Sequence, residues 1–433
     1  MVQQKQQNGN TIAIIMMILL FGMISFVTNL AAPMGVVLGE QFGVSDNVGM
    51  LGNLFNFLAY AAMGIPAGIL LQKIGYKKTA LIAVVIGFVG VFIQFLSGHV
   101  GGAQTPTLVV YFLGAFVAGL SMTLLNTVVN PMLNTLGGGG NKGNQLIQVG
   151  GSFNSILATF TPAFVGILIG ETTKAQITDV FPVMYIAMGV FALIFVVLWA
   201  VSIPEPGLEK SVEPTGQLMS GALKFRHFIL GAIAIFVYVG VEVGTPATAN
   251  LWFSKMPEVG KTIAGSIAGT YWLMMLIGRL FGASVAGKVT AKTMLSVGSL
   301  IALILVLLTI FSPTTTSVSM PLMQRSGAGG LDFGLVQVPI NAMFLVLVGL
   351  CTSIMWGGIY NLAVEGLDKF TKAASGIFMV MVCGGGIIPW LQATVADSAG
   401  YTISYWVMFA GFAYLLFYAV AGSKNVNKDI KVD

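Results

Sequence analysis

Twelve apolar stretches, each long enough to cross a lipid bilayer, dominate this 433-residue chain. A membrane-spanning helix needs about 20 mainly apolar residues. The stretches lie near residues 11–38, 47–72, 79–98, 106–135, 145–170, 181–203, 228–252, 262–287, 293–312, 336–364, 372–396 and 401–422. Only 8% of all residues are charged, against roughly 25% in an ordinary soluble protein. The pattern predicts an all-α membrane protein with twelve transmembrane helices.

A polar stretch rich in proline and charge divides these segments into two groups of six. We therefore expect an N-terminal six-helix bundle over 1–203, a cytoplasmic linker over 204–227 and a C-terminal six-helix bundle over 228–433. The stretches GILLQKIGYKKT (68–79) and GASVAGKVTAKT (282–293) occupy equivalent places in the two halves. A duplicated six-helix unit is typical of secondary transporters, which bind substrate between the halves near the middle of the membrane.

The distribution of Lys and Arg sets the expected orientation. Fifteen of the 20 Lys and Arg residues fall on the side that holds both termini, and four fall on the opposite side. Since cytoplasmic loops carry the excess of positive charge, both termini are expected to be cytoplasmic. No basic run is longer than a pair, so the net charge of +5 gives no indication of nucleic acid as a partner.

Amide side chains recur inside the predicted spans. Asn126 and Asn130 are four residues apart and share one helix face. An amide without a partner in hydrocarbon costs several kcal/mol, so these groups are expected to face one another, water or a ligand. Contacts between helices are the structural alternative. The amides proposed to bind substrate are Asn29, Asn56, Asn126, Asn130, Gln148, Asn154 and Asn361.

Aromatic side chains and two charges complete the candidate site. Tyr238, Trp272 and Tyr360 lie within the second half and are predicted to contact substrate, although some aromatic residues must form the interfacial belts. Glu242 and Arg279 lie within spans, where charge is costly and therefore indicates function. Glu242 is the candidate for cation coupling, and Arg279 is interpreted as a gating or structural charge.

The motifs resemble those of a known family. GILLQKIGYKKT is similar to the loop motif of the major facilitator superfamily, in which Lys73, Lys77 and Lys78 take the place of gating or structural charges and Gln72 stands where the family has Asp. The stretches NTVVNPMLNTLG (126–137), SFNSI (152–156), AIFVYVGVEVG (234–244), LAVEGLDKFTKAASG (362–376) and GGGIIPWLQATVADSAG (384–400) resemble its fucose–galactose–glucose/proton symporter family.

This resemblance implies the major facilitator fold and the uptake of a hexose, a 6-deoxyhexose or a related sugar by alternating access. It further implies a multi-pass protein of the bacterial inner membrane, acting as a monomer, with the sugar and the lipid bilayer as its partners. No cofactor and no metal are implied, and only H+ or Na+ would be co-transported. An enzyme is not indicated, because His99 and His227 lie at segment ends, far from any catalytic arrangement.

The coupling carboxylates of the family are replaced in this chain. Ala32 stands where the resemblance places a carboxylate in the first span, and Asn126 stands in place of the second. An amide binds a sugar hydroxyl but does not exchange a proton near neutral pH. Proton coupling through Glu242, sodium coupling and facilitated diffusion of a sugar or another small neutral solute therefore all remain open. A sugar sensor that transports nothing is the alternative from a different class.

Overall fold

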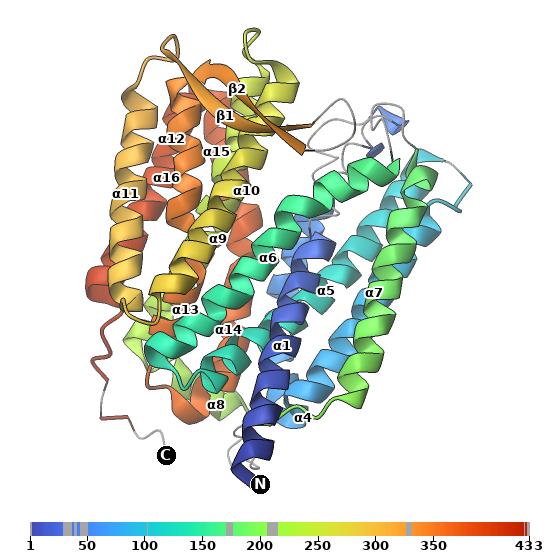
Figure 1. Ribbon diagram of the computed structural model, residues 1–433, viewed down its shortest axis with the longest axis vertical. Coiled ribbons are helices and arrows are strands. Elements are labelled where there is room, and N and C mark those ends of the chain that lie inside the picture. The colour runs from blue at the N-terminus through green and yellow to red at the C-terminus, as the bar shows by residue number, and fades with distance from the viewer. Residues whose placement is uncertain are drawn as a thin grey trace.

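The computed structural model describes residues 2–28, 37–38, 41–43, 51–101, 103–169, 176–205, 215–325, 331–427 and 429–430. Nearly all of them belong to long helices, which lie in two groups (Figure 1). The helices of the first half of the chain form one group, and those of the second half form the other. Asn29 and Ala32 lie outside the described residues.

The first group, here called the N-terminal bundle, is formed by α1 and α4 to α7. Their bounds are α1 Val2–Thr28, α4 Leu51–Ser97, α5 Gln104–Leu136, α6 Gly140–Ile169 and α7 Phe181–Ala200, preceded by a short 3-10 turn at Ile177–Val180. The short α8, Thr215–Ala222, lies in the predicted linker.

The second group, here called the C-terminal bundle, is formed by α9 to α16 and one β-hairpin. Its helices are α9 Arg226–Ser254, α10 Gly260–Val285, α11 Ala291–Phe311, α12 Ile340–Thr352, α13 Met355–Val364, α14 Thr371–Val380, α15 Gly384–Ala399 and α16 Tyr401–Phe417. Both bundles have their ends on the same two sides of the molecule. The side that holds both chain termini is called the terminal end below (Figure 1).

The number of crossings agrees with the sequence. Ten stretches of the described helices are long and apolar enough to span a membrane. One of them, Leu54–Ser97, is 44 residues long and passes through Gly75, whose backbone is not helical (φ 82°, ψ −177°). Counting α4 as two passes and adding α6, which is 30 residues long, gives twelve. Large apolar side chains such as Phe311 (72% exposed) cover the outer surface, where lipid contacts them.

The turn inside α4 is fixed by a carboxylate that follows the sixth span. Glu205 accepts hydrogen bonds from the backbone N–H groups of Tyr76 (2.7 Å) and Lys77 (2.9 Å), which begin the second part of α4. A negative charge is favourable at such a helix N-terminus. The Lys77 ammonium donates to the carbonyls of Trp199 and Val201. Lys73 and Lys78, the other two residues of the motif, are exposed.

Two features of the C-terminal bundle differ from the sequence prediction. The tenth span was expected to begin near residue 336, but residues 331–339 form β2, which pairs with β1 (Ser317–Arg325) in an antiparallel hairpin. The helix begins only at Ile340. Burial alternates along β2, since Phe333, Leu335 and Gln337 are exposed while Val336 and Val338 are covered, and this period of two fits a strand with one covered face.

The tenth span is also interrupted, which the prediction of one continuous helix missed. Helix α12 ends at Thr352 and α13 begins at Met355. The hydroxyls of Thr352 and Ser353 bond back to carbonyls of the preceding turn, at Val348 and Leu350. Such bonds compete with the helical ladder, and the break leaves the carbonyls of Ser353 and Ile354 free to accept other donors.

The two bundles meet closely where glycines face each other. Gly64 and Gly68 of α4 lie against Gly376 and Val380 of α14. A Cβ atom added at Gly376 would be 2.6 Å from the Gly64 carbonyl oxygen and 2.9 Å from the Gly68 Cα. Small residues allow membrane helices to approach this closely, so backbone packs on backbone across the bundle interface.

We predict that Gly376→Ala destabilises this packing by about 1–3 kcal/mol, the usual effect of overpacking. Gly189→Ala is the matched control, because a Cβ atom at Gly189 meets nothing within 4 Å. The thermal unfolding midpoint of the purified protein in detergent should fall for Gly376→Ala and stay unchanged for Gly189→Ala. Equal midpoints for the two variants would contradict the assignment of a tight crossing.

Candidate functional site

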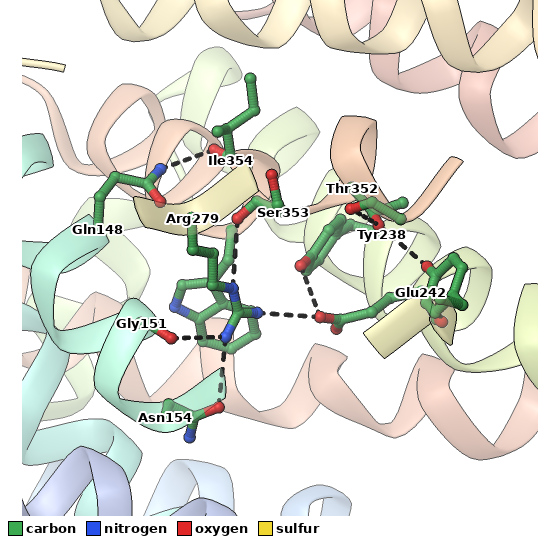
Figure 2. Close-up of polar contacts among 12 residues, drawn as sticks. Gln148, Gly151, Asn154, Tyr238, Glu242, Arg279, Thr352, Ser353 and Ile354 are labelled. Carbon is green, nitrogen blue, oxygen red and sulfur yellow. Dashed lines mark hydrogen bonds and ion pairs between the residues drawn. The ribbon is translucent and has the colours of Figure 1, made fainter. Parts of the chain in front are cut away.

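Arg279 of α10 occupies the centre of the molecule and contacts both bundles. Its Nη1 donates to the Gly151 carbonyl (3.0 Å) and to Asn154 Oδ1 (3.3 Å), both on α6 of the N-terminal bundle. Its Nη2 lies 3.1 Å from Glu242 Oε1 on α9, and its Nε donates to the Ser353 carbonyl (3.3 Å). Figure 2 shows the guanidinium between these partners. One charged group therefore joins four segments from two halves of the chain.

Glu242 balances this charge. The side chains of Arg279 and Glu242 are only 10% and 12% exposed, and a charge within a membrane needs a partner. Glu242 Oε1 also accepts a hydrogen bond from the Tyr238 hydroxyl, one turn earlier on α9 (2.8 Å). The carboxyl group of Glu242 points toward the Arg279 guanidinium (Figure 2).

Proline loosens α9 beside this carboxylate. Pro246 has no N–H to offer to the Glu242 carbonyl four residues earlier. The Tyr271 hydroxyl lies 3.2 Å from that carbonyl and donates to it, and it is also 3.0 Å from the Thr352 hydroxyl. The end of α12 is thereby connected to α9 and α10 through one buried tyrosine.

The break between α12 and α13 supplies acceptors to the site. Gln148 of α6 donates to the Ile354 carbonyl (2.8 Å), just as Arg279 donates to Ser353 (Figure 2). Irregular backbone is tolerated within a membrane where it is enclosed by protein or lines a cavity. The sequence held a signal for this break in the Thr352–Ser353 pair, but the apolar run around it concealed the interruption.

Asn126 and Asn130 belong to a second polar chain. Asn126 donates to the Tyr60 hydroxyl (2.8 Å), and Asn130 donates to the Asn126 carbonyl (2.9 Å). Asn130 Oδ1 accepts from the indole Nε1 of Trp356 on α13 (2.9 Å). Asn130 therefore links the two bundles through Trp356, an aromatic residue that was not among the predicted site residues.

The remaining predicted residues lie in separate places. Asn361 donates to Asn134 Oδ1 (3.1 Å) and to the Gly140 carbonyl (3.0 Å), which is a further contact between bundles. The Tyr360 hydroxyl is 3.1 Å from Ser375 within its own bundle. Trp272 stands edge-on to Tyr271. Asn56 is buried against Gly119 of α5, and its Oδ1 has no hydrogen-bond partner among the residues that the structure describes.

In this conformation the predicted binding residues Asn126, Asn130, Gln148 and Tyr360 are all buried, and each hydrogen-bonds to protein groups. Asn154, Glu242, Trp272 and Trp356 keep partial exposure. A cavity of about 380 Å³ lies elsewhere, between α8 and the segment before α14 at Phe370.

Phe57 of α4 contacts Gly385 of α15 far from the terminal end, and other cross-bundle contacts lie near that end. They include Gln145 with the Ala283 carbonyl (3.3 Å), Asn361 with Asn134, and the glycine crossing of α4 and α14. The helices of the two bundles diverge toward the opposite end (Figure 1). The conformation is therefore one in which the terminal end is closed. Among the described residues, no three His, Cys, Asp or Glu side chains lie together as metal ligands would.

Two half-molecules that enclose a polar site at mid-membrane are the architecture of a secondary transporter. The chain belongs to the Major Facilitator Superfamily, which it matches over residues 14–389. It is thus a multi-pass membrane transport protein and not an enzyme.

Named relatives refine this placement. The chain is 29% identical to a glucose/galactose transporter of Brucella abortus over 98% of its own length and 97% of that protein. It is 28% identical to a putative glucose/galactose transporter of Helicobacter pylori, with 97% and 99% covered. The L-fucose-proton symporter of Escherichia coli is 24% identical over 81% of this chain and 79% of that one.

Solved structures agree with the fold. The crystal structure of the transporter FucP in the outward conformation superposes with a TM-score of 0.79 at 18% identity, covering 96% of this chain and all of that one. The proton:xylose symporter XylE, bound to 6-bromo-6-deoxy-D-glucose, gives a TM-score of 0.67 at 13% identity, with 96% and 98% covered.

The buried ion pair predicts an asymmetric response to substitution. Arg279→Gln and Glu242→Gln each leave a charge without its partner, and each should destabilise the protein by about 3–5 kcal/mol. The double variant Glu242→Gln/Arg279→Gln removes both charges and should lie closer to wild type than either single variant. Thermal unfolding midpoints test this, and additive losses in the double variant would show that the two charges act independently.

Proposed function

We propose that this protein carries a hexose, a 6-deoxyhexose or a related sugar across the bacterial inner membrane by alternating access. The observation that supports this most directly is the polar cluster around Arg279, which lies between the bundles and is built from amides, hydroxyls and one ion pair. The names of the Brucella and Helicobacter relatives support a sugar as the solute.

The chemistry of the site suits a polyhydroxylated, uncharged solute. A sugar hydroxyl both donates and accepts, and so do the amide groups of Asn130, Gln148 and Asn154. Asn154 and Trp272 remain partly exposed in the terminal-end-closed conformation, so part of each side chain is not covered by protein. The amides that now bridge the bundles become available when those bridges break.

Alternating access would then exchange one set of partners for another. Opening of the terminal end requires Asn130 and Gln148 to leave their partners in the C-terminal bundle, and Asn361 to leave Asn134 in the N-terminal bundle. Each freed amide must find a new partner, because an unpaired amide costs several kcal/mol. Water and sugar hydroxyls in the opened cavity meet this need.

Glu242 is the proposed coupling group. It is a carboxylate at mid-membrane, 12% exposed, and its partners are a tyrosine hydroxyl and one guanidinium. Buried carboxylates of this kind mark proton pathways in transporters. Sodium symport and uncoupled diffusion are the competing mechanisms, and a non-transporting sugar sensor is the competing function.

The topology belongs to the same proposal. The excess of Lys and Arg at the terminal end favours a cytoplasmic position for both termini. The closed terminal end would then face the cytoplasm. We expect the monomer to be the transporting unit, because the polar site lies between the two halves of one chain.

The proposal predicts saturable, stereoselective uptake in proteoliposomes. Labelled glucose, galactose, fucose and N-acetylglucosamine are offered with imposed pH or Na+ gradients, and counterflow is measured without any gradient. We expect at least one of these sugars to be exchanged. Binding without counterflow would favour the sensor, and the absence of both for every sugar would contradict the proposal.

Glu242→Gln separates coupling from transport. Since glutamine cannot exchange a proton, accumulation driven by a pH gradient should be lost while counterflow persists. The double variant Glu242→Gln/Arg279→Gln serves as the charge-balanced control and should behave in the same way. If sugar addition acidifies the vesicle lumen as strongly with Glu242→Gln as with wild type, Glu242 does not carry the proton.

A further inference from the structure

Trp356 is the point at which the polar chain of the N-terminal bundle meets the C-terminal bundle. Its Nε1 donates to Asn130 Oδ1 at 2.9 Å. The indole stands between the rings of Tyr238 (centroids 6.2 Å apart) and Phe378 (6.3 Å). It keeps partial exposure, although Met355 and Gly357 on either side are buried. The ring is therefore held in place from within its own bundle while part of its surface is open.

Among the described residues, the indole N–H of Trp356 has one acceptor. An indole N–H can donate but cannot accept, and Asn130 Oδ1 is the acceptor that the structure gives it. Asn130 is fixed in turn, because its Nδ2 donates to the Asn126 carbonyl at 2.9 Å. The bond crosses the interface between α5 and α13, so it must break whenever the bundles separate at the terminal end.

A hydroxyl, of a sugar or of water, can enter this bond without leaving either atom unpaired. It accepts from the indole N–H with its oxygen and donates its own hydrogen to the amide oxygen. Two hydrogen bonds in series hold the indole and the amide farther apart than one does. A hydroxyl in this position therefore acts as a wedge between the bundles.

We propose that Trp356 is the residue through which a bound sugar releases the closed terminal end. The sugar ring covers the open part of the indole, and one of its hydroxyls inserts between Nε1 and Asn130 Oδ1. The sugar-dependent part of this inference rests on the proposed sugar transport. The other part, that the hydrogen bond between Trp356 and Asn130 keeps the terminal end closed, does not depend on any sugar. The ring contact with Tyr238, whose hydroxyl binds Glu242, places the same event next to the coupling carboxylate.

A buried thiol reports the opening of the terminal end. Ile147 of α6 is 1% exposed and contacts Gly357 of α13, so a cysteine there is shielded while the bundles touch. Ile147→Cys is introduced into a chain in which Cys351 and Cys383 are replaced by Ala. The rate of maleimide labelling of the purified protein in detergent then follows the open fraction.

Without any sugar, Trp356→Phe should label about fivefold faster than the parent, as expected for the loss of one hydrogen bond. Phenylalanine keeps an aromatic ring and removes the donor. Trp390→Phe is the matched control, because Trp390 is 68% exposed on the outer surface of α15, and its labelling rate should equal that of the parent. Asn130→Ala breaks the same bond from the other side.

The double variant Trp356→Phe/Asn130→Ala should label no faster than the faster single variant, because both substitutions remove the same hydrogen bond. Independent, multiplicative accelerations would overturn the proposal, and so would an unchanged rate in Trp356→Phe. Only variants that elute as folded protein in size-exclusion chromatography are compared. If Asn130→Ala misfolds, Asn130→Leu takes its place in the double-mutant comparison.

The sugar arm uses a transported hexose and its monodeoxy analogues. The hexose should accelerate labelling of the parent several-fold and should have no further effect on Trp356→Phe. One deoxy analogue should bind without accelerating labelling, which identifies the inserting hydroxyl. Equal acceleration by every analogue, or by the hexose in Trp356→Phe, would overturn the wedge. Absence of transport for every sugar would contradict the proposed function instead. The labelling rates measured without sugar would still decide whether the hydrogen bond between Trp356 and Asn130 closes the terminal end.

Discussion

The guanidinium of Arg279 sets the strongest constraint on this protein. A charge at mid-membrane must be balanced and hydrogen-bonded, and here the balance comes from two halves of the chain: Glu242 supplies the opposite charge, while Gly151 and Asn154 supply acceptors from the other bundle. The position of α6 relative to α9 and α10 is thereby tied to one side chain. Any movement of the bundles at this level must rearrange its hydrogen bonds.

The length of the apolar stretches, the polar segment between them and the placement of Lys and Arg were sufficient to predict twelve crossings, two halves and the turn near Gly75. They work because lipid imposes a minimum length on every apolar span. The β-hairpin was missed because the apolar residues of β2 run directly into the apolar start of α12. The break at Ser353–Ile354 was missed because it depends on local side-chain bonds, which hydropathy does not register.

For the candidate site, the sequence identified the residue types but not their partners. Glu242 and Arg279 stood out as charges, yet only the structure pairs them, because they are 37 residues apart on different helices. Asn126 and Asn130 were predicted to share a face, and they do form one hydrogen-bonded unit. Their connection to Trp356 crosses 226 residues of sequence, and no pattern within a single chain reports a contact of that kind.

The glycine crossing of α4 and α14 has a consequence for leakage. Where backbone lies directly on backbone, no flexible side chain can yield by a fraction of an ångström and admit a file of water. The two helices are either in register or apart, and partial openings are disfavoured. Such close packing reduces the leakage of ions down the membrane potential. A cell that depends on a proton gradient needs its membrane carriers to be tight to ions.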